Sequence, residues 1–139
     1  MRSAKKILAL DAKKAIRFII LFGSAAKKKN NPLSDVDIAV YYQGNKSERF
    51  KFRVKASGEL STKIDLHIFQ DLPVAVQKEV LSGKSLYYDN YSFMFEQYLA
   101  VIKEFNTFEK YYNQYLHELR QYHFQSSQVH CVQEVIPQR

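Results

Sequence analysis

The chain has a single cysteine, and none of its apolar runs approaches the roughly 18 residues of a membrane-spanning helix. An internal disulfide is therefore excluded, and the position of Cys131 in a polar C-terminal stretch fits a reducing compartment. The first residues, MRSAKKILALDAKK, carry charge too often for the core of a signal peptide. Internal repeats and low-complexity tracts are also lacking. These absences predict a protein that stays in the cytoplasm, neither inserted in a membrane nor secreted.

Length and charge set the next limits. A chain of 139 residues, 46% hydrophobic and 25% charged, is long enough for one ordinary globular domain but too short for two independent cores. The net charge of +7 favours anionic partners. Nucleotides, nucleic acid and an acidic protein surface would all satisfy it, so charge alone does not choose among them.

Apolar runs alternate with helical patterns along the first two thirds of the chain. This alternation predicts an α/β (α+β) domain in which helices flank a small mixed β-sheet. Strands are expected over 16–22, 35–42, 63–69 and 85–88, and helices over 3–15, 25–29, 44–61 and 73–83. The helix over 44–61 is charged and predicted to be solvated, whereas the last of these helices has Pro73 in its first turn and Gly83 as its C-cap.

A long helical segment follows the last predicted strand. Large apolar and aromatic residues recur at spacings of three and four over 91–122, and Asn106-Thr107 is the expected break, because an unbroken helix would exceed the diameter of a compact domain. We expect a core over 1–90, a helical extension over 91–124 that packs on the core, on a partner or on both, and a weakly ordered tail over 125–139.

Gly23 and Ser24 lie where the first predicted strand turns toward a helix. A glycine at such a turn lets the backbone approach a phosphate closely, and the free N–H groups of the helix start point toward the phosphate oxygens. Ser24 adds a hydroxyl donor. The sequence therefore predicts a phosphate-binding turn.

Three aspartates are predicted to face this turn. Asp35 and Asp37 are two residues apart in the run DVDIAVYY, so on a strand they share one face, and Asp65 lies within the apolar run of the third strand. Neighbouring carboxylates repel each other unless a divalent cation accepts oxygen from both. The trio suits two Mg²⁺ ions that bridge a nucleoside triphosphate and an attacking hydroxyl, with Asp65 on the side of the nucleophile.

The runs LFGSAAKKKNNPLSDVDIAVYY, KIDLHIFQDLP and LSGKSLYYD resemble the minimal nucleotidyltransferases of the DNA polymerase β superfamily. The likeness covers about 16–89. It implies the polymerase β-like nucleotidyltransferase fold and Mg²⁺-dependent transfer of a nucleotide, typically AMP from ATP, to a hydroxyl. By position, it assigns phosphate binding to Gly23 and Ser24, metal bridging to Asp35 and Asp37, and the third carboxylate to Asp65.

The phosphate turn departs from the family pattern. Where relatives commonly carry Arg and then Gly, this chain has Lys27 and Lys28. Lysine keeps the positive charge but loses the bidentate geometry of arginine, and replacing glycine stiffens the loop. Lys27 is a candidate phosphate ligand, with a solvated loop lysine as the alternative.

Histidines give weaker signals. His67 shares the face of Asp65 by the period of two, and we interpret it as a hydrogen-bonded structural residue rather than a catalytic one. His123, His130 and Cys131 match no zinc-binding spacing.

Partners follow from the second half of the C-terminal helix, whose aromatic residues exceed what a small monomer leaves in water and predict a protein interface. The resemblance implies a helical HEPN-domain protein as partner, in an antitoxin and toxin pair, and homodimerisation competes with it. Two alternatives to catalysis on a partner stay open. One is neutralisation of the partner by binding alone, and the other is modification of RNA ends, for which the chain offers no separate nucleic-acid-binding domain.

Overall fold

The computed structural model of the chain describes residues 2–23 and 35–128. The predicted helix over 25–29 and the candidate phosphate ligands Ser24 and Lys27 lie outside these residues, as do Lys28 and most of the expected tail over 125–139. The chain divides into two compact units, Met1–Ile102 and Lys103–Arg139. The first unit holds the sheet and the candidate site, and each unit is described by itself below.

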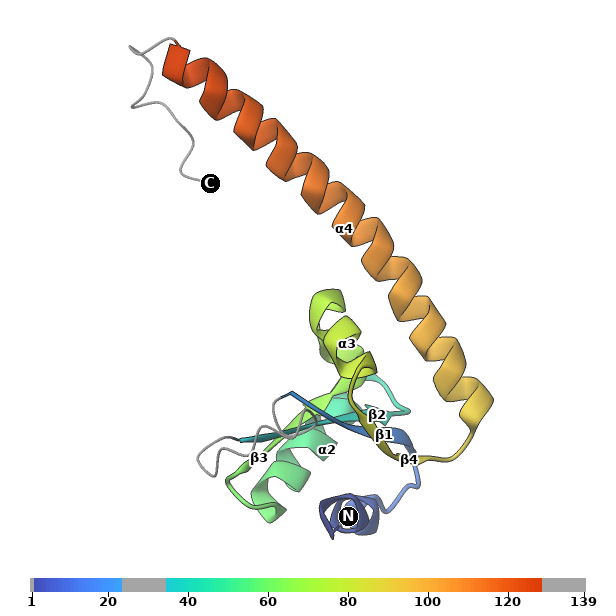
Figure 1. Cartoon of the computed structure of the whole chain (residues 1–139). Helices are drawn as coiled ribbons and strands as arrows, with labels where there is room; N and C mark the ends of the chain where they lie inside the picture. Colours follow the sequence, from blue (N-terminus) through green and yellow to red (C-terminus); the bar gives the residue numbers. More distant parts are fainter. Residues whose placement is uncertain (1, 24–34, 129–139) are drawn as a thin grey trace. The chain divides into compact units, whose positions relative to one another are not determined.

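Four strands form one mixed sheet (Figure 1). Its order is β3-β2-β1-β4, in which β2 and β3 are parallel and the other pairs are antiparallel. The elements follow the chain as α1 (Arg2–Leu10), β1 (Ile16–Phe22), β2 (Val36–Tyr42), α2 (Lys46–Glu59), β3 (Ile64–Ile68), a 3₁₀ turn η1 (Phe69–Asp71), α3 (Val74–Leu81), β4 (Lys84–Tyr88) and α4 (Tyr91–Gln128). The predicted architecture, a small mixed sheet flanked by helices with a long C-terminal helix, is confirmed.

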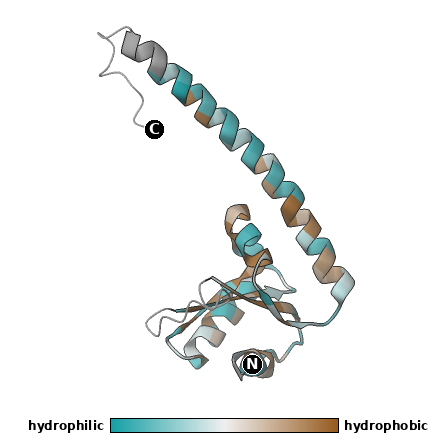
Figure 2. Ribbon diagram, viewed as in Figure 1, coloured by the Kyte–Doolittle hydropathy of each residue, from teal (hydrophilic) through white to brown (hydrophobic). Residues whose placement is uncertain are grey.

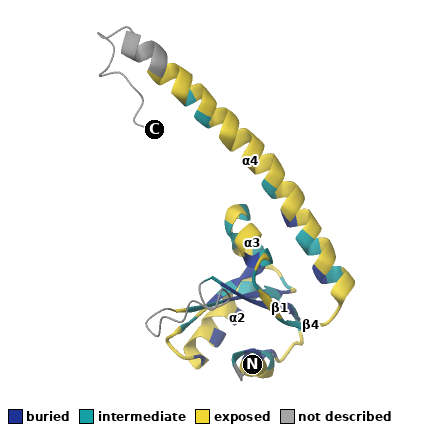
Figure 3. Cartoon of the chain, in the orientation of Figure 1, coloured by how far each residue is buried: buried dark blue, intermediate teal, exposed yellow. Residues whose placement is uncertain are grey.

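The two faces of the sheet are covered by different helices. Helices α1 and α2 pack on one face, which we call the α2 face, where Ile7, Ile38 and Ala56 are fully buried (Figures 1 and 3). Helix α3 and the first turns of α4 cover the other, the α3 face, where Phe18 and Val80 are fully buried. Strand β1 carries apolar residues on both faces and is buried along almost its whole length, as its β-branched and aromatic run predicts.

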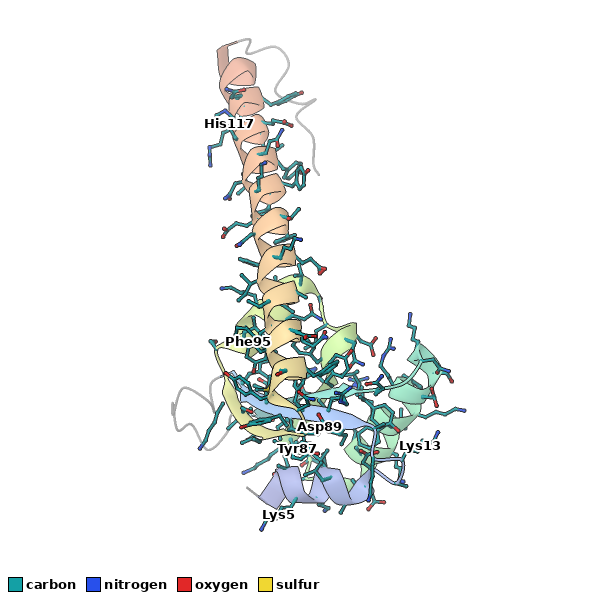
Figure 4. All side chains as sticks on the ribbon, turned by 90° about the vertical axis from the view of Figure 1, so that its right-hand side faces the viewer. Lys5, Lys13, Tyr87, Asp89, Phe95 and His117 are labelled. Atoms are coloured by element: carbon teal, nitrogen blue, oxygen red, sulfur yellow. The ribbon has the colours of Figure 1, made fainter. Side chains whose placement is uncertain are left out.

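Arg17 ties the end of β4 to the start of α4. Its guanidinium donates to both carboxylate oxygens of Asp89, at 2.9 and 3.2 Å, and lies 3.8 Å from the ring centroid of Phe93. Tyr87 and Asp89, labelled in Figure 4, follow one another along β4 and into the connection. Asn90 then accepts a hydrogen bond from the backbone N–H of Phe93, which caps the first turn of α4.

Several predicted boundaries differ from the observed ones, most clearly in the helices. The first helix ends at Leu10 rather than at residue 15, because the carboxylate of Asp11 accepts a hydrogen bond from the N–H of Ile16 and Lys14 takes a positive φ of 51°. The predicted solvated helix over 44–61 begins at Lys46 after a capping box at Asn45, and it is not wholly solvated, because it buries Phe52 and Ala56 on the sheet.

Gly83 was expected to be the C-cap of α3, but the cap is Ser82. Among the described residues, the glycine with positive φ is Gly23, so Gly83 is not needed for a left-handed turn. A Cβ at Gly83 would collide with the carbonyl oxygen of Leu21. The chain has glycine there because the backbone passes directly against β1.

The expected break at Asn106-Thr107 is absent, since α4 is continuous from Tyr91 to Gln128. The sequence of α4 contains neither glycine nor proline, the residues that most strongly interrupt helices. The hydroxyl of Thr107 donates to the carbonyl oxygen of Lys103 at 3.2 Å, so this polar group is satisfied within the helix. Hydropathy changes along α4, from largely hydrophobic in its first turns to mostly hydrophilic beyond them (Figure 2).

Candidate functional site

Two of the predicted carboxylates meet where β2 and β3 begin. In the parallel pairing of these strands Asp37 stands directly beside Asp65, and in the antiparallel pairing of β1 and β2 it stands beside Phe22. Both aspartates belong to the α3 face, because the residues that alternate with them, Ile38 and Leu66, are buried on the α2 face. Strand order therefore places Gly23, Asp37 and Asp65 in a row across one end of the sheet.

His67 joins the two carboxylates. Its Nε2 lies 3.2 Å from Oδ2 of Asp65 and 3.5 Å from Oδ1 of Asp37. Each of these three side chains offers one ligand atom, and the three atoms lie within 4.8 Å of one another. The His67 ring also lies 5.6 Å from the ring centroid of Phe22, which holds it over the sheet. The described residues thus bring two carboxylate oxygens and one imidazole nitrogen close enough together to share a metal ion.

Asp35 is placed differently from the expectation of a shared strand face. It is exposed and precedes β2, which begins at Val36, and it is not part of the group whose ligand atoms meet. Its negative charge nevertheless reaches Asp37, as the pKa of Asp37 shows.

The pKa of Asp37 is raised above its ordinary value of 3.8. Burial of the carboxyl group is the largest cause, and the charges of Asp65 and Asp35 raise it further, while the hydrogen bond and charge of His67 oppose the rise. Two further carboxylates thus lie near enough to act on Asp37, and a bound cation relieves the repulsion between such neighbours. Carboxylate oxygens are the ligands that Mg²⁺ prefers, so Asp37 and Asp65 fit a divalent metal ion, with Asp35 and His67 close to it.

Gly23 closes the row on the β1 side. It takes a left-handed backbone conformation with a φ of 77°, and a Cβ at this position would lie 2.6 Å from Oδ2 of Asp37. Both the backbone angle and the carboxylate therefore require glycine. Of the predicted phosphate-binding residues, Gly23 is described and lies against Asp37, and Ser24 and Lys27 lie outside the described residues.

Only part of this site is evident from the sequence. The position of His67 two residues after Asp65 predicted a shared face, and that prediction is confirmed. Its simultaneous contact with Asp37 was not predicted, because it depends on the pairing of β3 beside β2, with His67 opposite the small residue Ala39. A pocket of about 290 Å³ that His67 helps to line was also not predicted.

This arrangement of turn, strands and carboxylates defines a nucleotidyltransferase fold. The sequence profile of the family "Polymerase beta, Nucleotidyltransferase" matches residues 5–92, more than half of the chain. The protein belongs to this family. No curated protein matches the sequence significantly.

Solved structures agree on the fold. A chain of a toxin-antitoxin crystal structure with AMP-PNP superposes with a TM-score of 0.69 at 19% identity, over 86% of this chain and 97% of that chain. A chain of the complex between a tri-AMPylated HEPN toxin of Shewanella oneidensis and its MNT antitoxin gives 0.63 at 20% identity, over 86% and 97%. A chain of the MntA-HepT toxin-antitoxin crystal structure gives 0.62 at 19% identity, over 86% and 95%. Within the described part of the chain, no helix is long and apolar enough to cross a membrane.

Proposed function

We propose that this protein transfers a nucleotide, AMP from ATP, to a hydroxyl group of a partner protein, with Mg²⁺ held at Asp35, Asp37 and Asp65. One observation carries the proposal: the carboxylates of Asp37 and Asp65 meet beside a left-handed glycine at the end of the sheet. Family membership supports the reaction class. Neighbouring structures support ATP as the donor and a protein as the acceptor, since one contains AMP-PNP and another an AMPylated toxin.

The order of strands supports a different role for each side of the proposed site. Gly23 directly follows β1, so the phosphates of the nucleotide bind on that side, with Ser24 and Lys27 as their further ligands. Asp65 lies on β3, the opposite side, where the acceptor hydroxyl arrives. Asp37 stands between them and faces both substrates. Mg²⁺, when bound, neutralises the charge that builds up on the phosphates and the attacking oxygen.

The reaction exchanges one phosphoester bond for another. The hydroxyl oxygen of the acceptor attacks the α-phosphorus and forms a new O–P bond, while the bond from the α-phosphorus to the oxygen bridging to the β-phosphate breaks. Pyrophosphate leaves with the electron pair of that bond. The carboxylate of Asp65, whose side chain is 50% exposed, takes the hydroxyl proton and can pass it to water.

His67 acts as a positioning residue in this scheme. Donation from Nε2 toward Asp65 and Asp37 holds two carboxylates side by side that would otherwise repel each other. In this role His67 is a structural residue, as interpreted from the sequence, and it also belongs to the proposed site.

The proposed partner is a HEPN-domain protein, which this chain would restrain as the antitoxin of a pair. The supporting feature is an aromatic stripe on α4, which we define as Phe108, Tyr111, Tyr112, Tyr115 and Tyr122, all of them between 38% and 62% exposed. Their spacing of three, four and seven residues places them on one side of the helix. A second copy of this chain is the competing occupant of the stripe.

The test is transfer of label from α-labelled ATP to a co-expressed HEPN-domain protein. We expect labelling with Mg²⁺ and its loss by at least about 100-fold in Asp37→Asn and in Asp65→Asn, because each removes a carboxylate from the metal site. Glu79→Gln, an exposed residue of α3, is the control that should keep full activity. If the Asp37→Asn variant still binds and inhibits the partner without labelling it, the partner is instead neutralised by contact alone.

A further inference from the structure

A pocket of about 290 Å³ lies on the open edge of β3, beside the candidate site. Helix α2 contributes Lys46, Phe50 and Arg53 to its wall, and the segment that follows β3 contributes Asp71 and Leu72. His67 completes the wall and also contacts both carboxylates. The pocket is therefore connected to the site through one side chain.

The position of the pocket decides which substrate it serves. The strand order β3-β2-β1 puts Gly23 and the phosphate side at one end of the row and β3 at the other. Because β3 is an edge strand, a ligand in the pocket reaches His67, which contacts Asp65, from outside the sheet and away from the phosphates. Within the proposed function, this is the side from which the acceptor approaches.

The charge of the pocket is positive. Among the described lining residues the acidic one is Asp71, which is already paired with Arg49, whose guanidinium donates to both carboxylate oxygens at 2.8 and 3.2 Å. Lys46 is exposed and makes no ion pair in the described ranges 2–23 and 35–128. Arg53 donates its Nε–H to the carbonyl oxygen of Leu66, which is a neutral acceptor, and it forms no ion pair with another described residue. An anionic ligand is the occupant that this wall favours.

Apolar side chains also line the pocket, and one of them is unusually exposed to water. Phe50 is 60% exposed, although it lies on a helix that buries Phe52 and Ala56 in the core. Together with Leu72 it offers a ring and an aliphatic side chain next to the two cations. Exposed aromatic residues bordered by cationic groups are typical of protein-binding sites.

We propose that this pocket is the acceptor-docking subsite of the transferase, and that it takes an acidic protein segment which packs an apolar side chain against Phe50 and Leu72. Carboxylates of the segment pair with Lys46 and Arg53, and the bound segment then holds its hydroxyl beside Asp65. The proposal rests on the proposed function for the reaction but not for the binding. Acceptor selection is therefore encoded on α2, outside the row of carboxylates.

Binding can be measured with a fluorescein-labelled random copolymer of glutamate and tyrosine as the probe. We expect the combined variant Lys46→Glu with Phe50→Ala to raise the Kd for this copolymer about tenfold. The matched control is Lys51→Glu with Val54→Ala, which likewise reverses one charge and truncates one exposed apolar side chain on the same helix, at positions outside this pocket. The control should shift the Kd by less than about twofold. Label transfer onto the copolymer should fall in parallel, while binding of AMP-PNP stays unchanged.

Several outcomes would overturn the docking proposal. They are a wild-type protein that does not bind the copolymer, an equal loss in test and control variants, or variants that lose binding of oligoadenylate but not of the copolymer. The last result would assign the pocket to RNA. If the transferase function fails instead, the pattern is different. Asp37→Asn then behaves like wild type in every transfer assay, while copolymer binding still depends on Lys46 and Phe50.

Discussion

At the scale of single residues, Gly23 combines two requirements at one position. Its φ of 77° lies in the region that side chains with a Cβ rarely adopt, and a Cβ would press on Oδ2 of Asp37 at 2.6 Å. The first requirement concerns folding and the second concerns the site. A substitution here should therefore affect both stability and activity.

We predict that Gly23→Ala lowers the free energy of unfolding by about 1–2 kcal/mol, the cost of a left-handed conformation for an L-residue. Transfer of label should fall by more than the loss of folded protein explains, since the Cβ displaces the carboxylate of Asp37. Urea denaturation and the labelling assay measure the two effects separately.

Gly58→Ala is the matched control for this prediction. Gly58 lies in α2, and an added Cβ would meet no atom within 4 Å. Because alanine favours the helix over glycine, this variant should gain up to about 1 kcal/mol and keep its activity. A Gly23→Ala protein as stable and active as wild type would show that Asp37 does not need its observed position.

At the scale of elements, the start of β4 fits against β1 only because residue 83 has no side chain. A Cβ at Gly83 would collide with the carbonyl oxygen of Leu21 and would also contact Ile20 and Phe22, at 3.0 Å in each case. The obstacle on one side is backbone, which cannot rotate away.

Gly83→Ala should therefore destabilise the protein by about 2–3 kcal/mol, in the range of overpacked core positions, through the pairing of β4 with β1. Amide hydrogen exchange should show the loss of protection concentrated in β4 and the end of β1. Urea denaturation of the same variant supplies the total. Uniform loss of protection across the sheet, with β4 no more affected than β3, would contradict this account.

Local sequence patterns predicted the strands well and the site only in part. The β-branched run that became β1 was predicted to its last residue, because burial on both faces leaves an unmistakable composition. The first helix was predicted too long, since its apolar period could not reveal that Asp11 binds the N–H of Ile16. Non-local pairing was the harder part: that Asp65 would stand directly beside Asp37 depends on β3 joining β2 in parallel, which no local pattern specifies.

At the scale of the whole molecule, the two proposed recognition surfaces differ in character. The pocket beside β3 belongs to the first compact unit, and the aromatic stripe of α4 belongs to the second. Each surface is available for a separate contact with a partner. Loss of one surface should therefore leave binding at the other intact.

The aromatic stripe gives a prediction of its own. Tyr111→Asp with Tyr115→Asp should abolish association with a co-expressed HEPN-domain protein, or with a second copy, because charge is costly in a desolvated interface. Transfer to the glutamate and tyrosine copolymer should remain unchanged. Co-purification and sedimentation at micromolar concentration measure the association.

Asn113→Asp with His117→Asp is the control for the stripe. It adds the same number of carboxylates to the opposite side of α4, where both residues are exposed. Equal effects of the two double variants would show that charge, rather than the stripe, determines association. A wild-type chain that sediments as a strict monomer would remove the second copy as an occupant.

The parallel pairing of β3 with β2 determines how reliably the two carboxylates come together. A shift of one residue in the register of β3 against β2 would turn Asp65 and His67 into the hydrophobic core under α2. The same shift would move Leu66, now 2% exposed, out of that core. Misaligned chains would thus bury ionic groups and lose core packing at once, so they cannot compete with the correct form. Stable folding therefore requires the same strand register that places the carboxylates of the proposed metal site side by side.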